Sequence, residues 1–401
     1  MKALLKYRKH MANAGWVVGL NLVRQLIQLA FFAVLVRELS KTTVGEYQLI
    51  TSAIGLCGFF ILPGVSSMIM QSVARGHLGT FRKAFQFQLA GGVLGGIAIC
   101  LYALLMEAQA EELRVGMMIA GITFPLAYGL SGWTDFQAGQ GRFRQNAYWQ
   151  STVAIASYGT MIVLLLVTDI SLGWLIAVPN TVRAVINLLA LRMVLRQIPK
   201  DAEPEAGGLS YGLETSLYNV ANSVGNYIDK FLLFYLLSPE ALAVFVVSER
   251  IPEISKKYFQ QMRNVLVPSF SKKAKYTPEL NRKVNIASAV VSVAIIVVIF
   301  AVIPWFMPLM FTDAYGESVL YCQLLMGTLI IGQVAQTRNI FIISRLDATA
   351  MRNVTLGSNM IRILASAVLV PFFGIYGAIA STAIYRLSTA VIVSMLMKRY
   401  K

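Results

Sequence analysis

The stretch GWVVGLNLVRQLIQLAFFAVLV, residues 15–36, holds a single charged side chain, Arg24. As a helix it is long enough to cross about 30 Å of hydrocarbon. The short basic segment before it and the length of the apolar run differ from a cleaved secretory signal, which has a shorter apolar core and a small-residue cleavage site. This stretch therefore predicts a retained first transmembrane helix.

The composition of the whole chain agrees with that interpretation. Hydrophobic residues make up 57% of the 401 residues, charged residues only 13%, and the mean hydropathy is +0.64. A soluble protein with so few charges could not cover its own surface. The formal net charge of +16 would suit a nucleic-acid binder, but this hydropathy excludes one, so we expect no nucleic-acid partner and lipid as the main solvent.

Apolar runs of helical length recur along the chain, and they lack the period-two alternation of a membrane barrel. The fold class that follows is an all-α integral membrane protein with about twelve transmembrane helices. We place them at 15–36, 47–70, 84–106, 115–136, 148–168, 173–195, 211–236, 241–268, 284–306, 318–343, 354–372 and 376–397.

Basic residues in the connections set the orientation. Every second connection, starting with the N-terminus, carries lysine or arginine, whereas the alternate set carries only Arg37, Lys41 and Arg114. Positive connections face the cytoplasm. We therefore expect both termini in the cytoplasm and an even number of spans, with the chain in the cytoplasmic (inner) membrane.

A polar segment divides the predicted helices six from six. RQIPKDAEPEAGG, residues 196–208, is rich in proline, glycine and charge, which is typical of a flexible linker. We therefore predict a six-helix lobe at 1–195, a cytoplasmic linker at 196–210 and a second six-helix lobe at 211–401. The two halves echo one another weakly in sequence, so the lobes are expected to be pseudo-symmetric, with a cavity between them as in transporters.

Charged residues within the predicted spans are the candidates for function, because each costs roughly 2.5–3.5 kcal/mol at the centre of a helix in lipid. Cations outnumber carboxylates among them. The cations are Arg24, Arg183, Arg192, Lys230, Arg250, Lys256, Lys257, Arg263, Arg338, Arg362 and Arg386, and the acids are Asp135, Glu214, Asp229, Glu249 and Glu253.

Polar side chains also form stripes at helical spacing. One stripe is Asn21, Arg24, Gln25 and Gln28; another is Asn219, Asn222, Asn226 and Asp229, with Lys230 beside it. Such stripes point inward. They can hold helices together through hydrogen bonds and ion pairs, or they can line a hydrated lumen. The surplus of cations favours a lumen for an anionic ligand, since arginine suits the geometry of phosphate, with Arg250, Arg362 and Arg386 as further binding residues.

Residues for a metal or catalytic centre are scarce. Cys57, Cys100 and Cys322 are far apart in apolar segments, and both histidines, His10 and His77, fall in predicted connections. We predict no metal site, no cofactor and no catalytic residues. The proline and glycine residues in the spans, such as GGVLGG at 91–96, either are tolerated by neighbouring helices or act as hinges.

Four segments resemble the polysaccharide-biosynthesis flippases, the Wzx-type branch of the superfamily that also holds the multidrug MATE exporters. They are QLIQLAFFAVLVRELSKTTVGEYQLITS (25–52), SVGNYIDKFLLFYLLSPEALAVFVVSERIPEI (223–254), MPLMFTDAYGES (307–318) and FGIYGAIASTAIYR (373–386). Asp229-Lys230 corresponds to the Asp-Lys pair of the family. The chain departs from the family pattern at Ala243-Val244-Phe245, where Gly-x-Tyr is usual, and at Thr312, where glycine is common.

The resemblance implies two six-helix lobes arranged as a V. It also implies movement of an undecaprenyl-diphosphate-linked oligosaccharide from the cytoplasmic to the periplasmic leaflet by alternating access, for surface polysaccharide such as O-antigen or exopolysaccharide. A polysaccharide polymerase and a chain-length regulator are the protein partners that such a role implies. Relatives are thought to couple transport to an ion gradient, which would make Asp229, Glu249 and Glu253 the candidates for ion coupling.

Two other functions are weighed against this one. A MATE-like drug or metabolite antiporter for cationic drugs should have an acidic lumen, which is the opposite of the charge found here. A membrane enzyme such as a polysaccharide polymerase, ligase or glycosyltransferase needs an extramembrane site, but the predicted non-cytoplasmic connections are about a dozen residues or fewer. We therefore expect a transporter rather than an enzyme.

Overall fold

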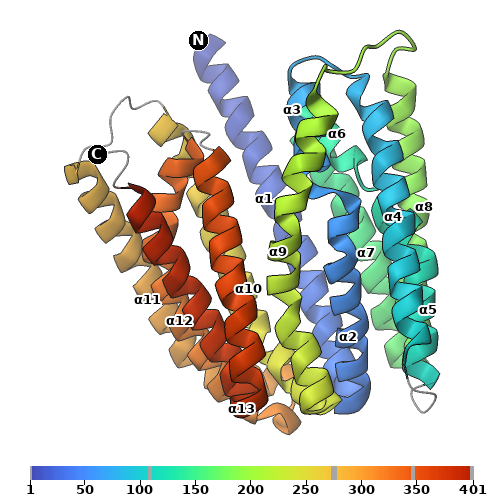
Figure 1. Ribbon diagram of the computed structural model, residues 1–401, viewed down its shortest axis with the longest axis vertical. Helices are drawn as coiled ribbons and strands as arrows, with labels where there is room; N and C mark the ends of the chain where they lie inside the picture. Colours follow the sequence, from blue (N-terminus) through green and yellow to red (C-terminus); the bar gives the residue numbers. More distant parts are fainter. Residues whose placement is uncertain (1, 107–110, 272–277, 345–347, 398–401) are drawn as a thin grey trace. The chain divides into compact units, whose positions relative to one another are not determined.

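The computed structural model describes residues 2–106, 111–271, 278–344 and 348–397 (Figure 1). Side chains are described in these ranges except at 2–14, 258–285, 287–289, 291–292, 333–348, 350–351 and 397, so Arg263 and Arg338 lie outside the described side chains. All regular secondary structure in the described part is helical, which confirms the all-α prediction. The chain forms two compact units, Met1–Ser223 and Val224–Lys401.

Unit 1 contains the first eight α-helices and the start of the ninth. They are α1 (Lys2–Glu38), α2 (Lys41–Cys57), α3 (Pro63–Ala74), α4 (Thr80–Leu104), α5 (Glu111–Phe124), α6 (Trp133–Gly139), α7 (Phe143–Val167), α8 (Leu172–Gln197) and α9 (Gly208–Leu236), with short helices η1 (Gly58–Ile61) and η2 (Pro125–Gly129). Helix α1 packs along α7, and α5 packs between α4 and α8 (Figure 1).

Helix boundaries in unit 1 follow local chemistry. Ser40 is extended and its hydroxyl accepts the Thr43 N–H at 3.1 Å, so it caps α2 and starts the second span at residue 41 rather than 47. Helix α1 begins at Lys2, so His10, expected in a connection, lies on a helix instead. His77 lies in the turn between α3 and α4, as predicted.

Two of the predicted spans are broken helices. In the second span, Leu62 has φ +60° and Pro63 starts α3, because proline cannot continue the preceding helix. In the fourth span, Pro125 opens a π-helical turn, η2. The carbonyl of Ala127 in that turn accepts the Asn187 side-chain N–H at 2.8 Å. A neighbouring helix therefore satisfies a backbone group at the break.

The glycines of GGVLGG are packing positions. A Cβ on Gly91 would lie 1.9 Å from the carbonyl oxygen of Phe60, and one on Gly96 would lie 2.5 Å from that of Gly121. Helix α4 approaches η1 and α5 so closely that only glycine fits, as is common between membrane helices. These contacts support the interpretation of these glycines as tolerated by neighbouring helices rather than as hinges.

The segment between α8 and α9 is docked on unit 1, so the prediction of a flexible linker is wrong for it. Arg82 donates to the carbonyl of Ile198 at 2.8 Å, and Arg75 pairs with Glu205 at 2.9 Å. Ile198 is buried in the same apolar cluster as Phe81. The sequence did not predict these contacts, because the segment is rich in proline, glycine and charge, as flexible linkers are. The single apolar residue that packs into the cluster, Ile198, gives no pattern in the sequence.

Unit 2 contains the rest of α9 with α10 (Pro239–Ser271), α11 (Pro278–Phe311), η3 (Asp313–Tyr315), α12 (Glu317–Ser344) and α13 (Ala348–Met397). Helix α12 packs against α10, α11 and α13. Helix α13 contains the last two predicted spans. Gly374, with φ +56° and ψ −128°, breaks the helix between them. This break falls in the gap predicted between 372 and 376.

Eight helical stretches among the described residues are long and apolar enough to cross a membrane, and one of them, Arg352–Leu396, covers two predicted spans. Helices α9 and α10 are long enough but carry more polar residues. The division into lobes at 196–210 remains a prediction, since the compact units meet inside α9, between Ser223 and Val224.

Candidate functional site

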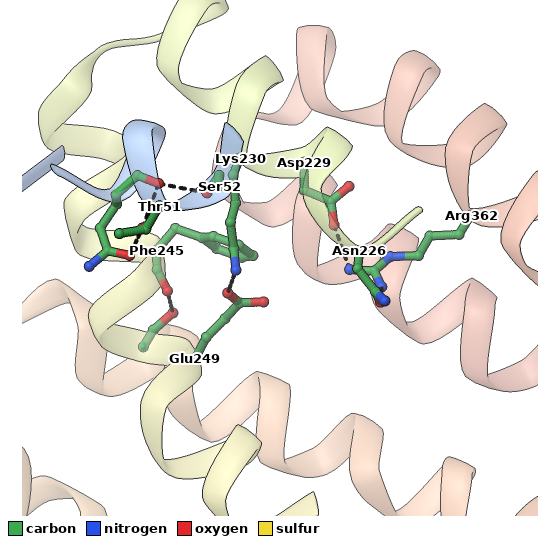
Figure 2. Close-up of polar contacts among 10 residues, drawn as sticks. Thr51, Ser52, Asn226, Asp229, Lys230, Phe245, Glu249 and Arg362 are labelled. Atoms are coloured by element: carbon green, nitrogen blue, oxygen red, sulfur yellow. Dashed lines mark hydrogen bonds and ion pairs between the residues drawn. The ribbon is translucent and has the colours of Figure 1, made fainter. Parts of the chain in front are cut away.

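A buried ion pair joins α9 to α13 in unit 2. The Arg362 guanidinium donates to Asp229 Oδ2 at 2.9 Å and to Asn226 Oδ1 at 3.0 Å. Ser366 donates a short hydrogen bond to the other oxygen of Asp229. Both charged side chains are almost fully buried, with 1% of Asp229 and 9% of Arg362 exposed. Figure 2 shows Asn226 and Asp229 on α9 facing Arg362.

A second ion pair lies one residue further along α9. Lys230 Nζ is 3.1 Å from Glu249 Oε2 on α10, and the two side chains point toward one another in Figure 2. Helical spacing explains why both pairs form, because neighbouring positions on α9 face different partners. Asp229 therefore meets α13, whereas Lys230 meets α10.

Further cations surround these pairs. Lys256 on α10 has Arg362 and Arg386 as cationic neighbours, and Glu249 and Glu253 as the nearby carboxylates. Arg386 donates to two neutral groups, Thr328 Oγ1 at 2.5 Å and the Leu325 carbonyl at 3.3 Å. Among the described residues it makes no ion pair with a carboxylate. Unit 2 therefore places half-buried Lys256 and Arg386 near the ion-paired Arg362, and like charges so close are unfavourable unless carboxylates, water or a bound anion offset them.

Arg24 in unit 1 is bound by neutral groups. It donates a short hydrogen bond to Gln150 on α7. The Gln150 amide donates to Asn146 at 2.9 Å, and Asn146 donates to the Thr134 carbonyl at 2.9 Å. This chain of amides orients the guanidinium without neutralising it. In the described part of the chain, Arg24 has no carboxylate partner.

Arg183 lies outside the binding set predicted from the sequence, although it falls within a predicted span. Its guanidinium lies 4.6 Å from the centre of the Tyr128 ring and is hydrogen-bonded to Tyr158. Tyr47 is a further neighbour. Aromatic rings stabilise a desolvated guanidinium. The tyrosines come from helices distant in sequence, so the only signal for this cluster was the deep arginine itself.

The structure brings together five of the predicted residues through direct contacts: Asn226, Asp229, Lys230, Glu249 and Arg362. Glu253 interacts electrostatically with Arg250 and Lys230. Asn222 lies half-buried on the same helix. These contacts show that part of the predicted binding set holds helices together, which was the alternative to a lumen.

The polar stripe on α1 makes fewer contacts with described side chains than the stripe on α9. Arg24 is bound as described, whereas Gln25 buries its side-chain oxygen without a hydrogen bond from a described residue. Asn21 and Gln28 are half-buried on the same helix. Whether the stripes of α1 and α9 line one lumen remains a prediction.

The family model of polysaccharide biosynthesis proteins matches residues 10–274, which is more than half of the chain. The chain belongs to the polysaccharide biosynthesis protein family. The matched region includes both ion-paired residues of α9, together with Arg24 and Arg183. No curated protein matches the chain in sequence.

Several solved transporter structures share the fold of this polysaccharide biosynthesis protein. One is a MOP superfamily transporter from Pyrococcus furiosus, whose binding pocket is described as having reverse polarity. It has a TM-score of 0.68 at 14% identity, and the match covers 96% of this chain and 94% of that one. An inward-facing multidrug MATE transporter has a TM-score of 0.66 at 14% identity, covering 94% and 96%.

The lipid II flippase MurJ, in an inward closed conformation, has a TM-score of 0.71 at 10% identity, covering 95% of this chain and 87% of its own. At these identities the likeness establishes the fold. Together with the eight apolar candidate spans among the described residues, it supports a multi-pass membrane protein, and these structural relatives are transporters or flippases rather than enzymes.

Proposed function

We propose that this protein moves an undecaprenyl-diphosphate-linked oligosaccharide from the cytoplasmic to the periplasmic leaflet of the inner membrane, by alternating access and with both termini in the cytoplasm. The observation that carries the proposal is the group of cations in unit 2, where half-buried Lys256 and Arg386 and buried Arg362 neighbour one another. A diphosphate is the part of such a cargo that this group would bind, because arginine and phosphate form strong charge-assisted hydrogen bonds.

The unpaired arginines extend this reasoning to both units. Arg24, Arg183 and Arg386 contact only neutral groups among the described residues. Removing such charges from water costs several kcal/mol each, which is acceptable where an anionic ligand or water completes the site. The remaining predicted polar residues, Asn21, Gln25, Gln28 and Asn222, are proposed to contact the sugars through hydrogen bonds.

A cationic drug would be repelled by the same groups. The proposal therefore favours an anionic cargo over the antiporter alternative, although MATE multidrug transporters share the fold. It also assigns no catalytic residue, so the chain is proposed to be a non-enzyme. A polysaccharide polymerase and a chain-length regulator are proposed as partners that use the exported unit.

The coupling ion is proposed to act at a carboxylate of unit 2. Asp229 and Glu249 each form an ion pair, whereas Glu253 interacts with several cations at once. Protonation of any of these three carboxylates would leave an extra positive charge in the group. Binding of the proton and of the anionic cargo would then favour one another.

The experiment that tests the proposal is flipping by the full chain reconstituted in vesicles. A lipid-linked oligosaccharide with a fluorescent sugar is added, and a membrane-impermeant glycosidase reports which leaflet holds it. We expect Arg386→Gln to lower the rate about 10-fold or more, since one charge-assisted hydrogen bond contributes about 1.5–3 kcal/mol. Arg386→Lys should retain part of the rate.

The matched control is Arg192→Gln, which removes an exposed arginine from α8 and should leave the rate unchanged. Arg183→Gln, on the same helix, should lower it. Flipping by Arg386→Gln and Arg183→Gln at the wild-type rate would contradict the proposed role of the buried cations. Absence of flipping by the wild-type protein, with transport of a cationic dye instead, would overturn the function itself.

A further inference from the structure

An apolar groove lies in unit 1 where residues 16–20 of α1 meet the beginning of α7. Its volume is about 1370 Å³, and its walls include Trp16, Val18, Leu20, Phe143 and Tyr148. Pockets for small ligands are typically about 300–1,000 Å³. The aromatic side chains are more than half exposed. The groove is therefore large enough for more than a small headgroup, and its walls suit an apolar chain.

Two arginines line the same groove. Arg144 lies with its guanidinium carbon 5.0 Å from the centre of the Trp16 ring, and Arg142 donates to the Gln197 side-chain oxygen at 2.7 Å. Both are exposed, and neither forms an ion pair with a carboxylate in the described part of the chain. Their partners hold them in place without cancelling their charge.

The turn before α7 keeps both guanidinium groups at the groove. Gly141 has φ +71°, a conformation that glycine adopts without strain, and it lets the chain reverse just before Arg142. Helix α7 then begins at Phe143 without a side-chain cap. The positive end of the helix dipole adds to the potential of the two arginines.

The charge pattern of the sequence places this connection on the cytoplasmic side. The groove thus combines two cations at the level of the cytoplasmic headgroups with an aromatic and aliphatic wall. A ligand that fits carries several negative charges next to a long apolar chain. A polyprenyl diphosphate has this chemistry, whereas an ordinary anionic phospholipid offers a single phosphodiester to the two guanidinium groups.

We propose that this groove is a docking site for the polyprenyl diphosphate end of the cargo in the cytoplasmic leaflet, before translocation. The proposal rests on the proposed function and adds a binding site to it. The diphosphate pairs with Arg142 and Arg144, and the first isoprene units lie against Trp16 and Phe143. The site lies wholly within unit 1 and is separate from the buried cations of α10 and α13.

The test is binding of undecaprenyl diphosphate to the full-length protein in nanodiscs, measured by native mass spectrometry with phosphatidylglycerol as competitor. We expect the double variant Arg142→Gln/Arg144→Gln to bind the probe at least 10-fold more weakly, since two charge-assisted contacts are lost. Val18→Trp, which fills the apolar wall at an exposed position, should also weaken binding. Lys83→Gln, which removes an exposed cation from the first turn of α4, should bind like the wild type.

The outcomes separate this proposal from the proposed function. If the wild type binds the probe and both groove variants bind it equally well, the groove is not the docking site, while the proposed function stands. If phosphatidylglycerol displaces the probe at equal concentration, the groove is a general site for anionic lipids and the proposal is wrong. If the wild type does not bind the probe at all, the groove proposal fails, and the flipping assay alone decides the proposed function.

Discussion

Breaking the Asp229–Arg362 pair should reveal how strongly α9 and α13 are held together. In Asp229→Ala, Arg362 would lose its 2.9 Å charge-assisted contact. It would keep the hydrogen bond to Asn226, the Tyr385 ring, whose centre is 5.4 Å away, and the weaker attraction of Glu249. Removing one partner of a buried pair costs about 3–5 kcal/mol, because the other charge stays buried and uncompensated. We therefore expect Asp229→Ala to lower the free energy of unfolding by about that amount.

The double variant Asp229→Ala/Arg362→Met should recover most of the loss. Replacing both charges by apolar groups removes the uncompensated cation, and such replacements are often close to neutral. The measurement is equilibrium unfolding in mixed micelles, followed by tryptophan fluorescence. The control is Asp169→Ala, which removes an exposed carboxylate between α7 and α8 and should have little effect.

The double-mutant cycle decides the matter. A coupling energy of about 2 kcal/mol or more is expected for a buried pair. If Asp229→Ala costs less than about 1 kcal/mol, or if the double variant loses the sum of the two single losses, the two charges do not stabilise each other. The reasoning about buried pairs in unit 2 would then be refuted.

Three further predictions concern other parts of the fold. Gly91→Ala should lower the thermal midpoint of unfolding markedly, since the added Cβ would meet the Phe60 carbonyl. Gly159 has open space around it, so Gly159→Ala should leave the midpoint unchanged. Equal midpoints for the two variants would contradict the close packing of α4. Thr312, at φ +69° and ψ 159°, occupies a region suited to glycine, so Thr312→Gly should stabilise the protein by about 1 kcal/mol; a thermal shift downward would argue against strain. Hydrogen bonds from Arg75 and Ser72 lower the pKa of Glu205 below its usual 4.5. The stabilisation by the Glu205 carboxylate is therefore complete above pH 4.5 and is lost as the pH falls through the lowered pKa. The difference in thermal midpoint between wild type and Glu205→Gln should shrink in that range, while Glu203→Gln should match the wild type throughout.

The sequence predicted the helices well because bilayer thickness imposes a minimum length on apolar runs. Each of the twelve predicted spans coincides with helix, and Pro63 and Pro125 lie at the two breaks. The exact starts were less accurate. The cap at Ser40 extends α2 by six residues beyond the expected start, because capping depends on a side-chain hydrogen bond that hydrophobicity does not register.

The partners of the charges were the hardest to predict. Asp229 and Arg362 are separated by 133 residues, and no local pattern connects them. The sequence showed that both are too deep to be left in lipid, which is a statement about each residue alone. Which cations are paired and which contact neutral groups depends on tertiary packing. The sequence therefore indicated the surplus of buried cations but not that Arg386, rather than Arg362, lacks an ion pair.

The docked segment between α8 and α9 has a practical consequence for dissecting this protein. A scheme that expresses the chain as two co-produced fragments would naturally cut at the polar residues 198–207. Such a cut would break the segment that Arg82 and Arg75 bind. It would also separate residues 208–223 from the rest of unit 1, to which they belong. Fragment complementation with a break in the apparent linker should therefore be inefficient, because that break divides unit 1 instead of separating it from unit 2.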